Sequence, residues 1–141
     1  MSYLIDTNVL SELRRKDPNP CVVNWVTNRP PSILYLSVLT LGEIRKGVEA
    51  LGDSTRKRKM TDWLEADLPH FFAGRILSVD ARVADRWGQI MATAVRPLSA
   101  LDSLIAATAL HHGFSLVTRN CKDFQYQGLA VINPWLDPAL S

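Results

Sequence analysis

Residues 2–13, which read SYLIDTNVLSEL, decide the fold class of this chain. Ser2–Ile5 is a short apolar run with a β-branched end, a pattern typical of a buried strand. The pattern changes at Asp6, and the residues from Asn8 to Arg15 are predicted to form a helix. A buried strand that passes directly into a helix is the opening unit of an α/β fold.

The same succession continues along the rest of the chain. We expect further strands at Ile33–Ser37, Arg75–Val79, Ser115–Thr118 and Ala130–Ile132. We expect further helices at Cys21–Asn28, Val38–Leu51, Thr55–Phe72 and Ala100–His112, and one that Asp80 caps. Strands separated by helical crossovers favour a mainly parallel sheet with helices on both faces, which is a three-layer α/β/α sandwich.

Apolar spacing predicts which helix faces are buried. The helix from Val38 is expected to bury Val38, Leu41, Ile44, Val48 and Leu51. The long helix after Gly52 is expected to bury Met60, Trp63, Leu64, Leu68 and Phe71. Pro97 and Ser99 are expected to introduce the last long helix, which Gly113 closes.

The composition limits the class of protein. The chain has 141 residues, of which 47% are hydrophobic and 21% charged, and this balance suits one globular domain over residues 1–141. No apolar stretch approaches the roughly 18 residues that span a bilayer. The N-terminal residues meet Asp6 at once and do not resemble a signal peptide. We therefore expect a cytoplasmic protein that uses no membrane, in which Cys21 and Cys121 are reduced thiols.

Four carboxylic acids stand in apolar surroundings. Asp6 directly follows the first strand, and Asp123 follows the strand Ser115–Thr118 after a short segment. Asp102 lies in the first turn of an almost entirely apolar helix, and Glu43 borders an apolar helical face. Because ligands of open parallel sheets bind at the carboxyl ends of the strands, Asp6 and Asp123 are expected beside that crevice.

Each acid also has a purely structural interpretation. Asp6 could cap the helix that follows it, and Asp102 stands after Ser99 with the spacing of a capping box. Glu43 could be a solvated edge residue, and Asp123 could cap a short turn. Spacing alone does not show that the four side chains converge.

Convergence of the four acids would require a cation. Crowded carboxylates raise one another's pKa values, and a divalent ion removes that conflict. Oxygen ligands without a nearby Cys or His favour Mg²⁺ or Mn²⁺ over Zn²⁺. Such ions activate water and stabilise an in-line phosphoryl transition state, so this arrangement would suit phosphodiester hydrolysis.

The charge balance agrees with a polyanionic substrate. The chain has 16 Lys and Arg against 14 Asp and Glu, a net charge of +2. If four acids share one metal site, the remaining surface carries a net charge of about +6. An acidic pocket within a basic surround suits an enzyme that acts on nucleic acid.

Four segments together resemble the motifs of a known family. Residues 4–13 (LIDTNVLSEL) are similar to the first motif of PIN-domain ribonucleases, and residues 37–44 (SVLTLGEI) resemble the second. Residues 101–109 (LDSLIAATA) and 118–124 (TRNCKDF) resemble the third and fourth. The order is that of the family, and the similarity extends from Tyr3 to about Pro134. Within the family, the chain resembles the VapC-type toxins of bacterial VapBC toxin–antitoxin systems.

The resemblance implies a PIN fold and a set of site residues. It implies that Asp6, Glu43, Asp102 and Asp123 form an acidic pocket around Mg²⁺ or Mn²⁺, with Asp6 and Asp102 as the most direct ligands. The family pattern also indicates supporting roles, which would fall to Thr7, Thr118 and Asn120. Glu12 is common in this family too, but we interpret it as a surface residue outside the metal site.

The resemblance also implies an activity and partners. VapC-type toxins cleave cellular RNA and are neutralised by a cognate VapB-type antitoxin. They commonly form homodimers and higher toxin–antitoxin assemblies. The pair binds its operator DNA through the antitoxin, and we find no DNA-reading element in this chain. The apolar helices Cys21–Asn28 and Val38–Leu51 are candidates for the antitoxin groove, although ordinary core packing explains their pattern equally well.

Basic side chains that follow the motifs could contact RNA phosphates, namely Arg14, Arg15, Arg45 and Lys46. The run Arg56-Lys57-Arg58-Lys59 is more typical of a solvated helix face.

Two alternatives remain. One is a PIN-like binding module without catalysis, acting in an operator-binding toxin–antitoxin complex. The other is a phosphatase with an aspartyl-phosphate nucleophile, although Asn8 stands where such enzymes usually carry a second Asp.

Overall fold

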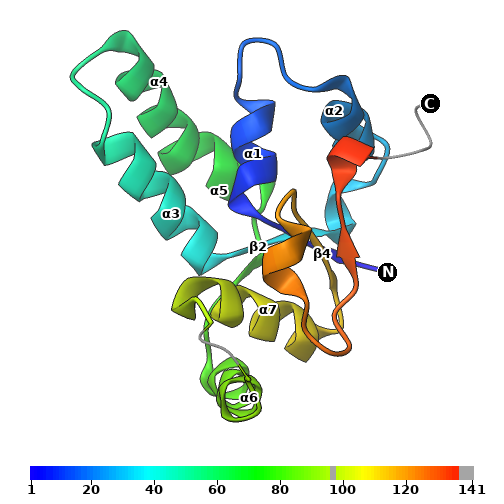
Figure 1. The fold of residues 1–141 in the computed structure, drawn as a ribbon. Coiled ribbons are helices and arrows are strands. Elements are labelled where there is room, and N and C mark those ends of the chain that lie inside the picture. Colours follow the sequence, from blue (N-terminus) through cyan, green and yellow to red (C-terminus); the bar gives the residue numbers. More distant parts are fainter. Residues whose placement is uncertain (96–97, 137–141) are drawn as a thin grey trace.

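The computed structural model describes residues 1–95 and 98–136 and has a parallel sheet at its centre (Figure 1). The strands are β1 (Tyr3–Ile5), β2 (Leu34–Ser37), β3 (Ile76–Leu77), β4 (Ser115–Val117) and β5 (Val131–Ile132). Every strand pair is parallel, and the order across the sheet is β3-β2-β1-β4-β5.

The position of β1 at the centre of the sheet determines where the functional crevice lies. Tyr3 pairs with Leu34 of β2 on one side and with Ser115 of β4 on the other. From β1 the chain first builds outward through β2 and β3, and later returns to add β4 and β5 on the opposite side. The order therefore reverses beside β1, and the carboxyl ends of β1 and β4 flank the switch point at which such sheets bind ligands.

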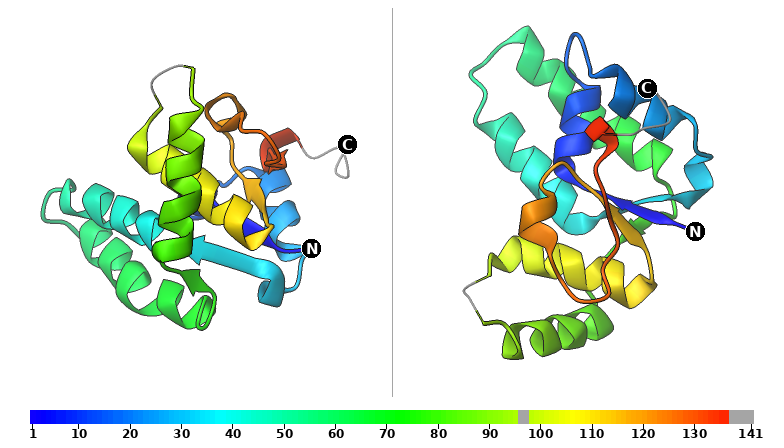
Figure 2. Two further views of the ribbon diagram at one scale, coloured as in Figure 1. Left: turned by 90° about the horizontal axis from the view of Figure 1, so that it is seen from below. Right: turned by 45° about the vertical axis from the view of Figure 1, so that its right-hand side comes forward.

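Helices cover both faces of the sheet. One face carries α1 (Thr7–Leu13), α2 (Pro20–Thr27), α3 (Val38–Glu49), α4 (Thr55–Asp62) and α5 (Leu68–Phe71). The other face is covered by α7 (Ala100–His112), and α6 (Ala81–Ala92) packs against α7 (Figure 2). The shorter helical segments are η1 (Pro31–Ile33), η2 (Trp63–Asp67), η3 (Cys121–Phe124) and η4 (Pro134–Leu136).

The strands contribute side chains to both cores because successive residues point to opposite faces. Ile5 and Val117 belong to the core under α1–α5, whereas Leu4 and Leu116 belong to the core under α7. This explains why both residues of the pairs Leu4-Ile5 and Leu116-Val117 are apolar. The predicted α/β/α sandwich is confirmed, and the sheet of the described residues is wholly parallel.

Most predicted elements are present with shifts of a few residues at their ends. Ser37 caps α3, Asp80 caps α6 and Ser99 caps α7, each through a side-chain oxygen that accepts a backbone N–H. Gly113, at φ 70°, closes α7 in the left-handed conformation, as expected of a glycine after a helix. Pro97, which was also expected to introduce α7, lies outside the described residues.

The predicted long helix Thr55–Phe72 differs in its last turns. Residues 63–67 form a π turn, and the N–H of Leu68 bonds to the carbonyl of Trp63. Pro69, which cannot donate to a preceding carbonyl, follows this wider turn. The extra residue rotates the helix end, so the prediction that Phe71 is buried is wrong. Phe71 is 44% exposed, and Phe72 takes the core position at 2%.

The exposure of Val38 corrects a second detail. Ile44 and Val48 are buried as predicted, whereas Val38, the first residue of α3, is 39% exposed.

Among the described residues, no helix is long and apolar enough to cross a membrane. Cys21 and Cys121 are both free thiols.

Candidate active site

Asp6 lies at the carboxyl end of β1 and combines two functions. As predicted by the structural interpretation, it caps α1: Oδ1 accepts the N–H of Thr7 at 2.9 Å. Its second oxygen, Oδ2, accepts the hydroxyl of Thr118 at 2.8 Å. The side chain is only 7% exposed, and this burial raises the pKa of Asp6 although both hydrogen bonds act in the opposite direction.

Asn8 completes a small network with Asp6 and the end of β4. Its Nδ2 donates to Thr118 Oγ1 at 3.1 Å and to Asp6 Oδ2 at 3.3 Å. Its Oδ1 accepts the N–H of Arg119 at 3.1 Å, and the N–H of Asn120 donates to Thr118 Oγ1 at the same distance. Thr118 and Asn8 thus hold Asp6 in position across the switch point. Thr118 supports the site through its side chain, but Asn120 does so through its backbone.

Glu43 lies in the second turn of α3 and faces the same crevice. Its Oε1 accepts the hydroxyl of Thr7 at 2.6 Å, so the start of α1 and the body of α3 are tied together. Burial is the main cause of the raised pKa of Glu43, and the negative charges of Asp6 and Asp102 raise it further. The Thr7 hydrogen bond acts in the opposite direction.

Asp102 reaches the crevice from the opposite layer. It lies in the first turn of α7, whose N-terminus is capped by Ser99, and its side chain is half-buried. Burial raises the pKa of Asp102, and the charges of Asp6 and Asp123 add to this effect. Asp123 belongs to η3 and is exposed.

The four predicted acids therefore share one electrostatic environment. Asp6 acts on Glu43 and Asp102, and Asp102 is also coupled to Asp123. Each of the four comes from a different part of the chain: the end of β1, α3, α7 and η3. They are not packed as a closed coordination shell, because no three His, Cys, Asp or Glu side chains of the described residues are close enough to hold one ion together.

The candidate ligands offer oxygen atoms alone, which is the donor set that hard divalent ions prefer. All four candidate ligands are carboxylates, and neither Cys121 nor the pair His111-His112 contributes a soft or nitrogen ligand to the cluster. Mg²⁺ usually binds through one or two carboxylates and keeps several waters, so it does not need a closed protein cage. A cation would relieve the repulsion that neighbouring carboxylates exert on Glu43 and Asp102. The residues fit a hard divalent ion.

Two charged residues near the site differ from expectation. Glu12 was interpreted as a surface residue, but it is 5% exposed, because its carboxylate accepts the N–H of Asn19 at 2.9 Å and pairs with Arg15. Glu12 therefore anchors the α1–α2 connection. Arg45, a candidate RNA contact, is held by Glu49 at 3.2 Å and by Glu65 at 2.6 Å.

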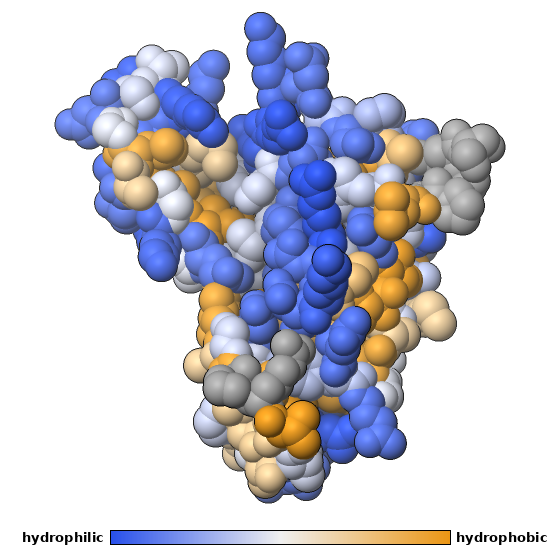
Figure 3. Space-filling view, in the orientation of Figure 1, coloured by the Kyte–Doolittle hydropathy of each residue, from blue (hydrophilic) through white to orange (hydrophobic). Residues whose placement is uncertain are grey.

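Asn8 belongs to the candidate site through its contacts with Asp6 and Thr118, and the sequence did not predict this. The available signal was its place in the first motif, one residue after Thr7, on the first turn of a helix that begins beside the crevice. Hydrophilic residues extend along the middle of the face that contains this region (Figure 3).

Comparison with known proteins gives a consistent result. The profile of the family described as PIN domain matches residues 3–126. Toxin FitB of Neisseria gonorrhoeae is 39% identical over 137 residues, which cover 95% of this chain and 99% of the relative. VapC ribonuclease Y4jK of Sinorhizobium fredii is 36% identical over 139 residues, covering 96% of this chain and 99% of the relative.

Solved structures agree with these relatives. The crystal structure of FitAcB from Neisseria gonorrhoeae matches with a TM-score of 0.89 and 38% identity, covering 96% of this chain and 99% of the other. The structure of FitAB bound to an IR36 DNA fragment matches with a TM-score of 0.87, over 94% of this chain and 95% of the other.

Proposed function

Since the chain belongs to the PIN-domain family, and within it to the VapC-type toxins, we propose that it is a metal-dependent endoribonuclease whose activity an antitoxin suppresses. The observation that carries the proposal is the placement of Asp6, Glu43 and Asp102 beside the switch point of the sheet. Thr7 bonds to both Asp6 and Glu43, and Asp6 and Asp102 lie near enough to Glu43 for their charges to act on it. A metal-dependent nuclease uses such a cluster to bind a cation opposite a phosphate.

Asp6 and Asp102 are the proposed direct ligands of Mg²⁺ or Mn²⁺, with Glu43 and Asp123 completing the pocket directly or through water. PIN-domain VapC ribonucleases generally depend on a divalent metal. The bound ion would polarise the phosphate and activate water. Asp6 suits a ligand role because Thr118 and Asn8 fix the orientation of its Oδ2.

The chain's own groups position the reaction. Thr7 donates to Glu43 Oε1 and leaves Oε2 of the same carboxylate to accept a hydrogen bond from a water molecule. Through Oε2, Glu43 would be placed to take up a proton from that water. Asp102 approaches from α7, so the cluster receives carboxylates from both helical layers of the sandwich.

Incubation of antitoxin-free protein with total bacterial RNA tests the proposal. We expect discrete fragments with Mg²⁺ or Mn²⁺, none with EDTA, and none from the double variant Asp6→Asn/Asp102→Asn. Intact RNA under every condition, from folded protein that binds metal, would instead favour the non-catalytic binding module. Survival of cleavage in the double variant would mean that the site is placed wrongly.

We also propose the surface that binds the antitoxin. An apolar groove of about 630 Å³ lies between α1, α2 and the η2–α5 segment. Its apolar lining is formed by Leu10, Leu13, Val26, Leu34, Trp63, Leu68, Phe71 and Phe72. Such a groove fits an apolar peptide segment of a partner, which supports α2 as a helix of the antitoxin groove. Phe71→Ser should weaken the toxin–antitoxin complex while the melting temperature of the free toxin changes little.

The remaining partner assignments follow from the family. The FitAB neighbour is bound to DNA, and we propose that this chain likewise meets operator DNA only through its antitoxin. A homodimer, a higher toxin–antitoxin assembly and a cytoplasmic site of action are further proposals. Sedimentation of the toxin alone and with its antitoxin measures the first two.

A further inference from the structure

A second groove begins at the Thr7–Glu43 pair and extends away from the carboxylates. It has a volume of about 590 Å³ and lies between α1 on one side and the α3–α4 hairpin on the other. The Thr7–Glu43 hydrogen bond lies in its wall, so the groove is continuous with the candidate active site. In Figure 3, apolar residues are visible in the hollow between the hairpin and the hydrophilic middle of this face.

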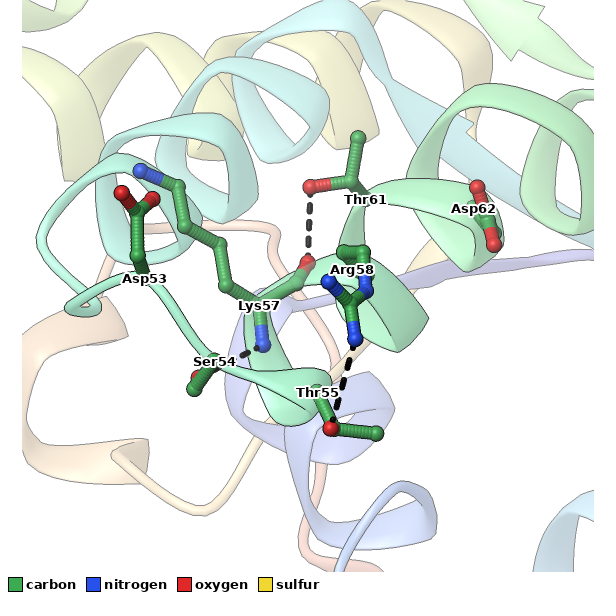
Figure 4. A pocket seen from close by; sticks show the side chains of 7 residues that line it. All are labelled: Asp53, Ser54, Thr55, Lys57, Arg58, Thr61 and Asp62. Atoms are coloured by element: carbon green, nitrogen blue, oxygen red, sulfur yellow. Dashed lines mark hydrogen bonds between the residues drawn. The ribbon is translucent and has the colours of Figure 1, made fainter.

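The four consecutive basic residues of α4, residues 56–59, point to different sides of the helix because of its periodicity. Arg56, Lys59 and Trp63 line the groove, as expected for residues three and seven positions apart on one helix face. Lys57 instead pairs with Glu49 at 3.8 Å. Arg58 donates to Thr55 beside a separate hollow at the start of α4, where Ser54 also caps the helix (Figure 4). Only half of the run is thus directed to the groove.

The polar lining of the groove is predominantly positive. Arg14 and Arg15 contribute from the end of α1, and Arg56 and Lys59 from α4, against Glu43 as the acidic residue of the lining. The guanidinium of Arg14 lies 5.2 Å from the centre of the Trp63 ring, a cation–π contact that helps to fix its position. Within the described residues, neither Arg56 nor Lys59 forms an ion pair.

The walls between these cations are apolar. Ile44, Val48, Leu51 and Met60 line this part of the groove. Cations along the walls of an apolar channel suit a single nucleic-acid strand, since phosphates meet the cations and bases cover the apolar surface. The apolar groove at α2 lacks this concentration of positive charge, so a peptide is better suited to that groove than to this one.

We propose that the α1/α3/α4 groove holds the RNA strand on one side of the scissile phosphate, with Arg56 and Lys59 as phosphate contacts. The proposal rests on the proposed nuclease function and assigns the substrate path of that site. Arg45, which the sequence suggested as a phosphate contact, is held by Glu49 and Glu65. Arg56 and Lys59 take that role instead, although the sequence pattern of residues 56–59 was typical of a solvated helix face.

A matched pair of variants tests the groove. Arg56→Gln/Lys59→Gln removes two charges from the groove, and Lys57→Gln/Arg58→Gln removes two charges from the same helix on its other faces. Binding of a fluorescent single-stranded RNA of mixed sequence is measured in EDTA at several salt concentrations, and cleavage of the same RNA is measured in Mg²⁺. Circular dichroism melting verifies that both variants fold.

The groove variant should bind RNA about tenfold more weakly, and its salt slope should fall by about 1.4 because two phosphate contacts are lost. The control variant should show a clearly smaller loss of affinity. If the wild type cleaves RNA but the two variants bind it equally well, the groove proposal is wrong and the nuclease proposal stands. Affinity for the antitoxin is measured on the same variants, and if the groove variant loses that affinity but keeps its RNA affinity, the groove proposal is wrong and the groove binds the partner protein. If the wild type cleaves no RNA, the nuclease proposal itself fails.

Discussion

Thr7 and Glu43 are joined by a hydrogen bond of 2.6 Å, although 36 positions separate them in the sequence. The hydroxyl of the first residue of α1 donates to a carboxylate in the second turn of α3. This contact holds Glu43 at the crevice against repulsion from Asp6 and Asp102. It also marks the boundary between the carboxylate cluster and the basic groove.

Loss of this hydroxyl should move the pH dependence of cleavage. The Thr7 hydrogen bond lowers the pKa of Glu43, so Thr7→Val should raise that pKa and leave less of the carboxylate ionised at a given pH. We expect cleavage near neutral pH to fall by about tenfold, with the acidic limb of the pH–rate profile moved to higher pH. Thr7→Ser keeps the hydroxyl and serves as the control. An unchanged acidic limb in Thr7→Val would mean that Glu43 does not titrate in the reaction.

Thr118 should be important for stability as well as for the site. Its side chain is fully buried, donates to Asp6 and accepts from Asn8 and Asn120. Thr118→Val keeps the shape but leaves these partners without the hydroxyl, at a cost of about 1–3 kcal/mol in the free energy of unfolding. Thr118→Ser should retain more of the stability. Urea denaturation of the three proteins measures the difference, and a Val variant as stable as the wild type would contradict the assigned network.

The carboxylate cluster should destabilise the metal-free protein at neutral pH. Folding raises the pKa values of Asp6, Glu43 and Asp102, so the native state binds protons more tightly than the unfolded state. The resulting stability is complete below the ordinary values of 3.8 for Asp and 4.5 for Glu, and is lost as pH rises through the raised native values.

Asp102→Asn removes one of these charges. In EDTA we expect its melting temperature to exceed that of the wild type by a few degrees, with the gap widening from about pH 4 to about pH 7. Mg²⁺ should stabilise the wild type and affect the variant less. A variant that melts below the wild type at neutral pH in EDTA would show that Asp102 is stabilising, against the repulsion described.

The two adjacent phenylalanines should respond very differently to truncation. Phe72 is 2% exposed in the core, so Phe72→Ala should cost about 3–5 kcal/mol. Phe71 is 44% exposed, and Phe71→Ala should cost about 1 kcal/mol or less. Chemical denaturation of both variants compares the costs. Equal losses would mean that the π turn does not rotate the end of the helix as described.

The same pair illustrates what the sequence could predict about the fold. Apolar periodicity, caps and turns located nearly every strand and helix, because those signals are local. A stripe read at a constant helical period assigns Phe71 to the core, whereas the structure contains a π turn at residues 63–67. Helical period is a property of the backbone, and the sequence does not state where one extra residue enters a turn.

For the candidate site, as for the fold, the sequence predicted the residues of local motifs but not the contacts between distant segments. The motifs predicted Asp6, Glu43, Asp102 and Asp123 as site residues. In the structure Asp6 and Asp102 act on Glu43, and Asp6 and Asp123 act on Asp102. Asn8 was missed because its value lies in contacts to Thr118 and Arg119, far along the chain. The prediction that Glu12 lies on the surface was wrong because an acid on a short helix is usually solvated. Glu12 is buried because the chain turns back after α1 and brings the N–H of Asn19 to its carboxylate.

The central claim is that these carboxylates catalyse metal-dependent RNA cleavage. It is tested most directly by the cleavage rate of one defined RNA by the wild type and by Asp102→Asn at saturating Mg²⁺, each repeated in EDTA. We predict a rate loss of about a thousandfold or more in the variant and in EDTA, with both proteins folded. Cleavage by Asp102→Asn at the wild-type rate, or wild-type cleavage that persists in EDTA, would contradict the account.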